Sequence, residues 1–276
     1  MNKLLLTFFF LFLFATHSSS QQKRTPTPFI LGQIDSIQSV ELKETRTINI
    51  YLPEGYSPDS ATMYPVIYLL DGSADEDFIH IAGLVQFANF PWVDMLPKSI
   101  VVGIANVDRK KDFTYPTTIE KDKKDYPTTG SSAKFIAFIE KELQPFIQQH
   151  YKTNAVKTII GQSLGGLLAT EILFKKPGLF TNYIIVSPSL WWDNESLLSK
   201  EPAILKQSFT QPISIYVAVG KEGAVMEGDS KKLIEILKKK NAKNLKVYFQ
   251  YLPDENHATI LHWAVYKAFQ YLNPKK

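Results

Sequence analysis

A single serine stands between glycines in the stretch TIIGQSLGGLLATEIL, residues 158–173, where a β-branched run meets a helix-forming run. Gly161-x-Ser163-x-Gly165 is the pattern of a nucleophile elbow, a strained turn in which side chains at the glycine positions would collide with the crossing strand and helix. A serine hydroxyl is a weak nucleophile on its own, because it must lose a proton to attack. Ser163 therefore needs a base within hydrogen-bond reach and a third group that orients the base.

The base is expected later in the chain, because elbow-type sites follow the order serine, acid, histidine. Three histidines precede the serine and fail this order: His17, His80 and His150. Of the two that remain, His257 follows the last strand-like run in YLPDENHATIL, whereas His262 lies inside an apolar helical segment, where packing explains it. We therefore predict His257 as the base.

The acid is expected at the end of a strand between the serine and the histidine. The run ISIYVAVG ends in Gly-Lys-Glu-Gly, which makes Glu222 the first candidate. Asp229 is the second, although GDSKKL is typical of a helix that begins with this aspartate as its N-cap. Asp254 and Glu255 are third, as sequence neighbours of the histidine. The sequence leaves these alternatives open.

Backbone amides are expected to stabilise an oxyanion beside the serine. Leu164 begins the helix behind the serine, where the first amides have no partner within the helix and the dipole is positive. The second donor is expected from the loop after the run YPVIYLLDG, where Gly72 and Ser73 carry free amides. The role of this loop is inferred from the fold rather than from a motif.

The elements that must position these groups alternate along the chain. Strand-like runs occur at 36–42, 45–53, 64–72, 98–107, 157–163, 182–189, 213–220 and 246–253. Several are continuous and β-branched, as in strands buried on both faces of a parallel sheet, whereas the first two alternate and fit an antiparallel edge pair. Helical segments are predicted at 131–151, 164–177, 229–242 and 257–272. This alternation predicts an α/β fold with a mostly parallel eight-stranded sheet and helices on both faces.

The composition limits the partners and the compartment. Lys and Arg number 31 against 27 Asp and Glu, a balance that gives no sign of nucleic-acid binding, and no cysteine is present to form a disulfide. Residues 1–20 combine a lysine, an apolar run at 4–16 and small residues, the layout of a secretory signal peptide. The run is short for a membrane span, although an uncleaved anchor is the alternative. We predict a signal peptide at 1–20, a linker at 21–28 and a catalytic domain at 29–276, exported to the periplasm or secreted, with no stable membrane insertion after cleavage.

Five motifs occur together in the chain: YPVIYLLDG, VVGIANVDRKKDFTYP, GQSLGG, SPSLWWDN and DENHATI. From about residue 37 to 273 the sequence resembles the putative-esterase family of the α/β-hydrolase superfamily, and the SPSLWW and ENH forms look most like its siderophore-esterase branch. The resemblance implies an α/β-hydrolase fold, no metal or organic cofactor, and Ser163 and His257 as nucleophile and base. The sequence departs from the family at Gln162, where His or Glu is usual.

Three further side chains are candidates for substrate binding. Trp191 and Trp192 follow a strand-like run, and one of them could stack on an aromatic or sugar ring while the other fills the core. Arg109 could bind an anionic group of the substrate or could instead pair with Asp112 to brace its loop.

We therefore expect an exported serine carboxylic-ester hydrolase that acts through an acyl-enzyme, with siderophore-type trilactone esters as the first choice of substrate. A carbohydrate esterase that releases acetyl or feruloyl groups from a glycan is the alternative. A non-catalytic ligand-binding hydrolase-fold protein is the third, and the intact serine, histidine and glycines disfavour it.

Overall fold

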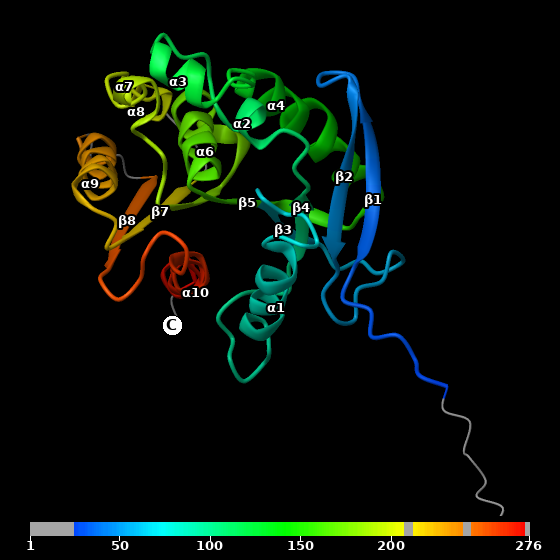
Figure 1. Ribbon diagram of the computed structural model, residues 1–276. Helices are drawn as coiled ribbons and strands as arrows, with labels where there is room; N and C mark the ends of the chain where they lie inside the picture. The colour runs from blue at the N-terminus through cyan, green and yellow to red at the C-terminus, as the bar shows by residue number, and fades with distance from the viewer. Residues whose placement is uncertain (1–24, 207–211, 240–243, 274–276) are drawn as a thin grey trace, which may run out of the picture. The chain divides into compact units, whose positions relative to one another are not determined.

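The computed structural model describes residues 25–206, 212–239 and 244–273, in which eight strands form one sheet (Figure 1). Their order across the sheet is β1-β2-β4-β3-β5-β6-β7-β8. Strands β1 and β2 pair antiparallel, β2 pairs antiparallel with β4, and the strands from β4 to β8 are parallel. The bounds are β1 Gln33–Ser39, β2 Glu44–Tyr51, β3 Tyr64–Leu69, β4 Ile100–Ile104, β5 Thr153–Gln162, β6 Asn182–Val186, β7 Ile213–Gly220 and β8 Leu245–Leu252. The predicted α/β fold with an antiparallel edge pair is confirmed.

Helices cover both faces of the sheet (Figure 1). Helices α1 and α10 pack on one face, and the other helices lie on the opposite side, where α4, α5, α6 and α9 bury their apolar stripes. The bounds are α1 Phe78–Ala88, α2 Arg109–Phe113, α3 Glu120–Asp125, α4 Ser132–Phe138, α5 Gln144–His150, α6 Leu164–Lys175, α7 Trp192–Glu195, α8 Ala203–Lys206, α9 Ala224–Lys238 and α10 Ile260–Leu272. A π-helical turn, Ile139–Leu143, joins α4 to α5, and the 3₁₀ turn Pro177–Leu179 follows α6.

Strand residues alternate between two cores, as the pleat of a strand requires. On β5, Ile159 belongs to the core under α4–α6 and α9, whereas Ile160 belongs to the core under α1 and α10. Both side chains are fully buried, which explains why the run reads as continuously apolar rather than alternating. Helix α6 is buried from Leu164 to Phe174, so the helix behind the serine is fixed on all sides.

The structure corrects several predicted boundaries. Strand β1 begins at Gln33 rather than at residue 36, because the chain already turns after Ser39 into β2. Helix α9 begins at Ala224 after Gly223, whose φ of 89° suits a glycine. The prediction that Asp229 caps this helix is therefore wrong, since Asp229 lies inside the helix. Helix α1 was absent from the sequence prediction.

The chain divides into two units between Ile30 and Leu31. The strands and helices described above belong to the unit that begins at Leu31. Of the unit that ends at Ile30, the structure describes 25–30, which are exposed and have no regular secondary structure. The predicted signal peptide and most of the predicted linker lie outside the described residues. In the described part of the chain, no helix has both the length and the apolar character needed to cross a membrane.

Candidate active site

The chain reverses sharply at the end of β5, and Ser163 occupies the turn. Its φ of 58° and ψ of −119° lie outside the regions that L-residues favour, so the backbone is strained here. Its amide donates to the carbonyl of Val186 at 3.1 Å, and its carbonyl accepts from the amides of Leu167 (2.9 Å) and Ser189 (3.0 Å). These bonds hold the strained turn between β6 and α6.

Close packing explains Gly161 of the elbow pattern, whereas a Cβ atom at Gly165 would approach no atom outside α6 closer than 3.3 Å. A Cβ atom at Gly161 would overlap the carbonyl group of Gly165, because strand β5 and the first turn of α6 cross at this point. A Cβ at Gly166 would approach the carbonyl of Val186 to 3.0 Å. The strand and helix thus approach each other as the nucleophile-elbow pattern requires.

The imidazole of His257 is paired with the carboxylate of Glu222, which follows β7. The distance from Nδ1 of the imidazole to Oε2 of Glu222 is 2.5 Å. Oε1 of the same carboxylate accepts from the hydroxyl of Ser187 at 2.5 Å and from the amide of Gly220 at 2.9 Å. The carboxylate is 3% exposed and the imidazole 47% exposed. A buried, fixed carboxylate therefore orients an imidazole that faces solvent.

Electrostatics keep Glu222 ionised. Burial alone would raise the pKa of this carboxyl group, but the hydrogen bonds from His257, Ser187 and the Gly220 amide outweigh burial and bring the pKa below its usual value. A carboxylate that is ionised at neutral pH and lies at Nδ1 favours the imidazole tautomer in which Nε2 is free to accept a proton.

The other acid candidates lie elsewhere. Asp229 is buried inside α9, and burial together with the negative charge of Glu195 raises the pKa of its carboxyl group to about 6. Asp254 is exposed on the loop before His257, and Glu255 contributes to this region through its main-chain carbonyl, which accepts from the amide of Lys221 at 2.7 Å. Of the four predicted candidates, the structure brings Glu222 alone to the imidazole.

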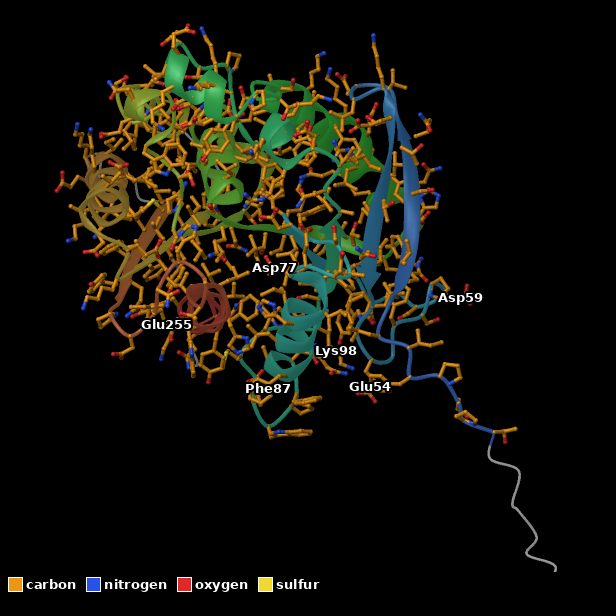
Figure 2. The ribbon with its side chains drawn as sticks, in the orientation of Figure 1. Glu54, Asp59, Asp77, Phe87, Lys98 and Glu255 are labelled. Atoms are coloured by element: carbon orange, nitrogen blue, oxygen red, sulfur yellow. The ribbon has the colours of Figure 1, made fainter. Side chains whose placement is uncertain are left out.

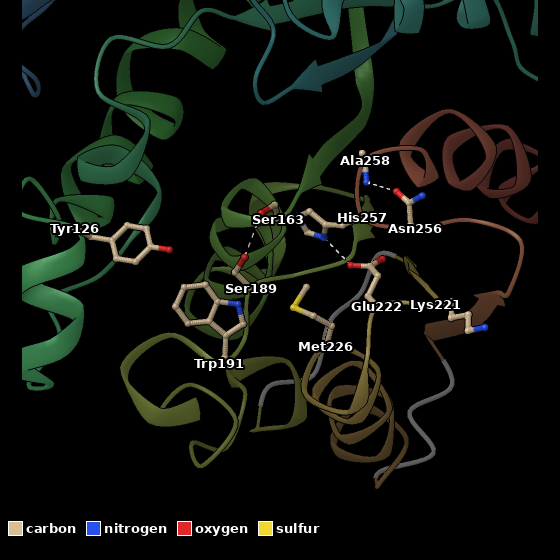
Figure 3. Close-up of a pocket in the computed structure, with 10 residues that line it drawn as sticks. All are labelled: Tyr126, Ser163, Ser189, Trp191, Lys221, Glu222, Met226, Asn256, His257 and Ala258. Carbon is tan, nitrogen blue, oxygen red and sulfur yellow. Dashed lines mark hydrogen bonds and ion pairs between the residues drawn. The ribbon is translucent and has the colours of Figure 1, made fainter.

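Ser163 and His257 line the same cavity, of about 730 Å³. Figure 3 shows the imidazole between the serine hydroxyl and the Glu222 carboxylate. The hydroxyl of Ser163 is 3.2 Å from the hydroxyl of Ser189, which follows β6. The arrangement can therefore pass a proton from a serine hydroxyl toward an oriented base, provided that the hydroxyl turns from Ser189 to the imidazole.

The predicted oxyanion donors divide into two groups. Leu164 is the first residue of α6, so its amide has no carbonyl of its own helix to pair with. Gly72, in contrast, donates its amide to the carbonyl of Ile104 at 3.0 Å, so this amide already has a partner and the prediction for it is wrong. The amide of Ser73 makes one long contact, 3.4 Å, to the carboxylate of Glu76 and is the donor that this loop can offer.

The two tryptophans separate clearly. Trp191 lines the cavity together with Tyr126 and Met226 (Figure 3). Trp192 is 0% exposed, and its indole N–H donates to the carbonyl of Tyr115 at 2.9 Å. The prediction that Trp192 binds substrate is therefore wrong, because its ring fills the core beneath the loop.

Arg109 lies in a second cavity, of about 440 Å³, that also reaches the serine and the histidine. Its guanidinium binds Asp71 with two hydrogen bonds, Nε to Oδ1 at 2.6 Å and Nη2 to Oδ2 at 2.9 Å. The predicted pairing with Asp112 is wrong, because Asp112 is buried against Arg46 instead. With its charge already matched by Asp71, Arg109 is less available to an anionic substrate than the sequence suggested.

The second cavity is acidic. Its wall includes Asp71, Glu76 and Asp77. Asp77 lies at the N-terminal end of α1, and Phe87 marks the other end of that helix (Figure 2). Burial and the neighbouring charges of Asp71 and Glu76 raise the pKa of the Asp77 carboxyl group to about 6. The walls on the two sides of Ser163 therefore differ, one aromatic and the other carboxylate-rich.

Ser187 and Ser189 were missed by the sequence analysis. Both follow β6 in the motif SPSLWW, so the rule that directed attention to the carboxyl ends of parallel strands could have found them. The described residues contain no group of three or more His, Asp or Glu side chains placed to hold a metal ion.

Comparison with known proteins points to one family. The model of a family described as "Putative esterase" matches residues 39–270. Ferri-bacillibactin esterase BesA of Bacillus subtilis (strain 168) is 30% identical over 247 residues, which cover 83% of this chain and 85% of that protein. Two solved structures have a TM-score of 0.80: an IroE-like serine hydrolase from Shewanella oneidensis (34% identity, 88% of this chain and 80% of that chain) and the BES protein from Bacillus cereus (29% identity, 93% and 100%).

Proposed function

The chain belongs to the putative esterase family and is an esterase; we propose that it is a serine esterase in which Ser163 is the nucleophile, His257 the base and Glu222 the orienting acid. The observation that carries this proposal is the Glu222–His257 pair. Glu222 follows β7, His257 follows β8, and both line the same cavity as the strained Ser163. A structural ion pair would not need a half-exposed imidazole at the end of a cavity beside a strained hydroxyl.

The proposed reaction uses the groups that line the site. Oγ of Ser163 forms a bond to the ester carbonyl carbon while its proton moves to Nε2 of His257. The resulting oxyanion accepts hydrogen bonds from the amides of Leu164 and Ser73. As the carbon–oxygen bond to the alcohol breaks, the same imidazole returns the proton to the alcohol, which leaves an acyl group on Ser163. A water molecule then loses a proton to His257 as its oxygen forms a bond to the acyl carbon. The bond between that carbon and Oγ of Ser163 breaks, Oγ takes the proton back from His257, and the carboxylic acid leaves.

Siderophore-type trilactone esters are the substrate class that we propose. The relative from Bacillus subtilis is named for ferri-bacillibactin. In this chain, Trp191, Tyr126 and Met226 give the larger cavity an aromatic and apolar wall, on which a planar ring of the substrate can stack. The ammonium group of Lys110 lies 4.9 Å from the centre of the Tyr126 ring and adds positive charge at this wall.

We also propose that the chain is exported through the predicted leader, residues 1–20, and acts outside the cytoplasm. A cleavable apolar segment of this length supports export rather than permanent insertion. The proposal predicts that the mature protein begins near residue 21, which N-terminal sequencing of the protein recovered from the periplasm or medium would establish. Retention of the full-length chain in the membrane fraction would contradict it.

A comparison of substrates tests the proposed class. We expect the purified protein to hydrolyse a catecholate trilactone, and acetylated or feruloylated xylan slowly or not at all, with Ser163→Ala as the inactive control. Hydrolysis of xylan esters alone would replace the siderophore assignment by that of a carbohydrate esterase. Tight binding of the trilactone without turnover would favour a ligand-binding protein with a hydrolase fold.

A further inference from the structure

The residue before the nucleophile is tied to the loop that carries the base. The side-chain amide of Gln162 donates a hydrogen bond to the main-chain carbonyl of His257. This contact joins two segments separated by 95 positions in the chain, the elbow after β5 and the loop after β8. It therefore couples the position of the base directly to the turn that presents the serine.

The other hydrogen bonds of this loop involve residues beside His257 and not its main-chain carbonyl. Two hydrogen bonds join Asn256 and Thr259 within the loop. The main-chain amide of Asn256 donates to the hydroxyl of Thr259 at 3.1 Å, and the main-chain amide of Thr259 donates to the carbonyl of Asn256 at 3.1 Å. The main-chain carbonyl of Glu255 accepts from Lys221 at 2.7 Å, two residues before the base. Among the described residues, the bond from Gln162 is the one that holds the main chain of His257 itself.

The main chain of Gln162 is in turn held by Arg109. Nη2 of Arg109 donates to the main-chain carbonyl of Gln162 at 3.3 Å. Arg109 is fixed by its two hydrogen bonds to Asp71, and Asp71 also accepts from the side chain of Asn106 at 2.7 Å. A continuous chain of hydrogen bonds thus runs from the end of β3, through Arg109 and Gln162, to the base.

We propose that Gln162 is a positioning residue that holds His257 over Ser163, an inference that depends on the proposed function. His257 has a half-exposed imidazole and is anchored at two points, at Nδ1 of the ring by Glu222 and at its main-chain carbonyl by Gln162. Loss of the second anchor lets the loop shift while the ion pair with Glu222 persists. A displacement of about 1 Å at a reacting group is enough to lower a rate by up to about 100-fold.

The amide of the side chain is the chemical requirement. An ionised glutamate at residue 162 has the same shape but cannot donate to a carbonyl, and a methionine has a similar length with no donor. Unlike a glutamate at the same position, Gln162 thus supplies a neutral donor to the loop that carries His257.

Two variants test this role, Gln162→Met and Gln162→Glu, with Gln33→Met as the matched control. Gln33 is exposed on β1 and donates to the hydroxyl of Tyr151 at 2.6 Å, so its loss removes a hydrogen bond of the same kind away from the cavity. We expect both Gln162 variants to lose about 10- to 100-fold in kcat, with KM within about twofold and Tm close to that of the wild type. The control is expected to keep wild-type kcat.

A spectroscopic measurement separates positioning from general destabilisation. Because Nδ1 of His257 lies 2.5 Å from Oε2 of Glu222, we expect the proton between them to give a far-downfield resonance in the wild type. We expect this resonance to broaden by exchange with water in Gln162→Met and to stay sharp in Gln33→Met. Wild-type kcat and a sharp resonance in both Gln162 variants would overturn the positioning role while leaving the proposed function intact. A wild-type protein that hydrolyses no ester would instead refute the proposed function, and this inference with it.

Discussion

Replacing Glu222 by glutamine changes one atom at the acid of the proposed site and has a calculable effect. Oε1 of Glu222 accepts from the hydroxyl of Ser187 and from the amide of Gly220, so the carbonyl oxygen of the introduced side chain is expected to stay on these two donors. Its NH₂ group then faces Nδ1 of His257. The imidazole must accept at Nδ1 and carry its proton on Nε2, which is the wrong tautomer for a base.

The magnitude follows from the geometry. Two unit charges about 4 Å apart attract by about 1 kcal/mol in water and by about 4 kcal/mol near a protein surface. Because Glu222 is 3% exposed and the imidazole 47% exposed, we expect the lost attraction to the imidazolium to be intermediate, about 2–3 kcal/mol. That corresponds to a factor of about 30–200 in rate, and the tautomer defect adds to it. A total loss of about 10²- to 10⁴-fold in kcat is expected.

Ester hydrolysis by Glu222→Gln and by Asp254→Asn provides the assay. Asp254 is the exposed carboxylate that precedes His257 on its loop, so its variant removes a nearby negative charge without touching the imidazole. We expect Asp254→Asn to match the wild type within about twofold and the Tm of Glu222→Gln to remain close to it. A Glu222→Gln protein with kcat within threefold of the wild type would refute the reasoning, as would a large loss in Asp254→Asn.

Other consequences follow from the packing and the charges. Trp191→Ala is expected to raise KM for the trilactone with little effect on Tm, because its ring lines the cavity, whereas Trp192→Ala is expected to lose about 3–5 kcal/mol of stability in urea unfolding, because its ring is fully buried. Equal effects of the two substitutions would contradict this division. Asp229→Asn is expected to stabilise the fold by about 1–3 kcal/mol at pH 8, because burial raises the carboxyl pKa to about 6 and the ionised form is the costly one above that pH. The gain should fade as the pH drops through 6 toward 4, where both states bind the proton, and a gain that grows on acidification would show that the sign is wrong.

The sequence predicts the fold and the position of the serine well because both depend on local patterns. The β-branched run before Ser163, the glycines around it and the helix-forming run after it are contiguous, so the strained turn can be predicted without tertiary information. Chain order reduces the five histidines to His257 and His262, and the place of His257 directly after the last strand-like run favours it over His262. Its closeness to Ser163 depends on β7 and β8 being added in parallel to the same edge of the sheet, which the alternation of elements indicates.

The sequence does not predict which way the side chains point, or which partners they find, in the loops that follow the strands. Trp191 and Trp192 are adjacent and identical in type, but Trp191 lines the cavity whereas Trp192 is fully buried in the core. The ion-pair partner of Arg109 is Asp71, which is distant in the sequence and has a left-handed backbone conformation with φ 54°. The engagement of the Gly72 amide depends on the register of β3 against β4, which no local motif encodes.

The most direct test of the account is covalent labelling of the nucleophile. The purified protein is treated with a fluorophosphonate, and its intact mass and peptide masses are measured beside those of Ser163→Ala and Ser189→Ala. The account predicts one phosphonyl adduct on the peptide that contains Ser163, its absence in Ser163→Ala and its persistence in Ser189→Ala. A folded wild-type protein without an adduct, or with the adduct on another residue, would contradict it.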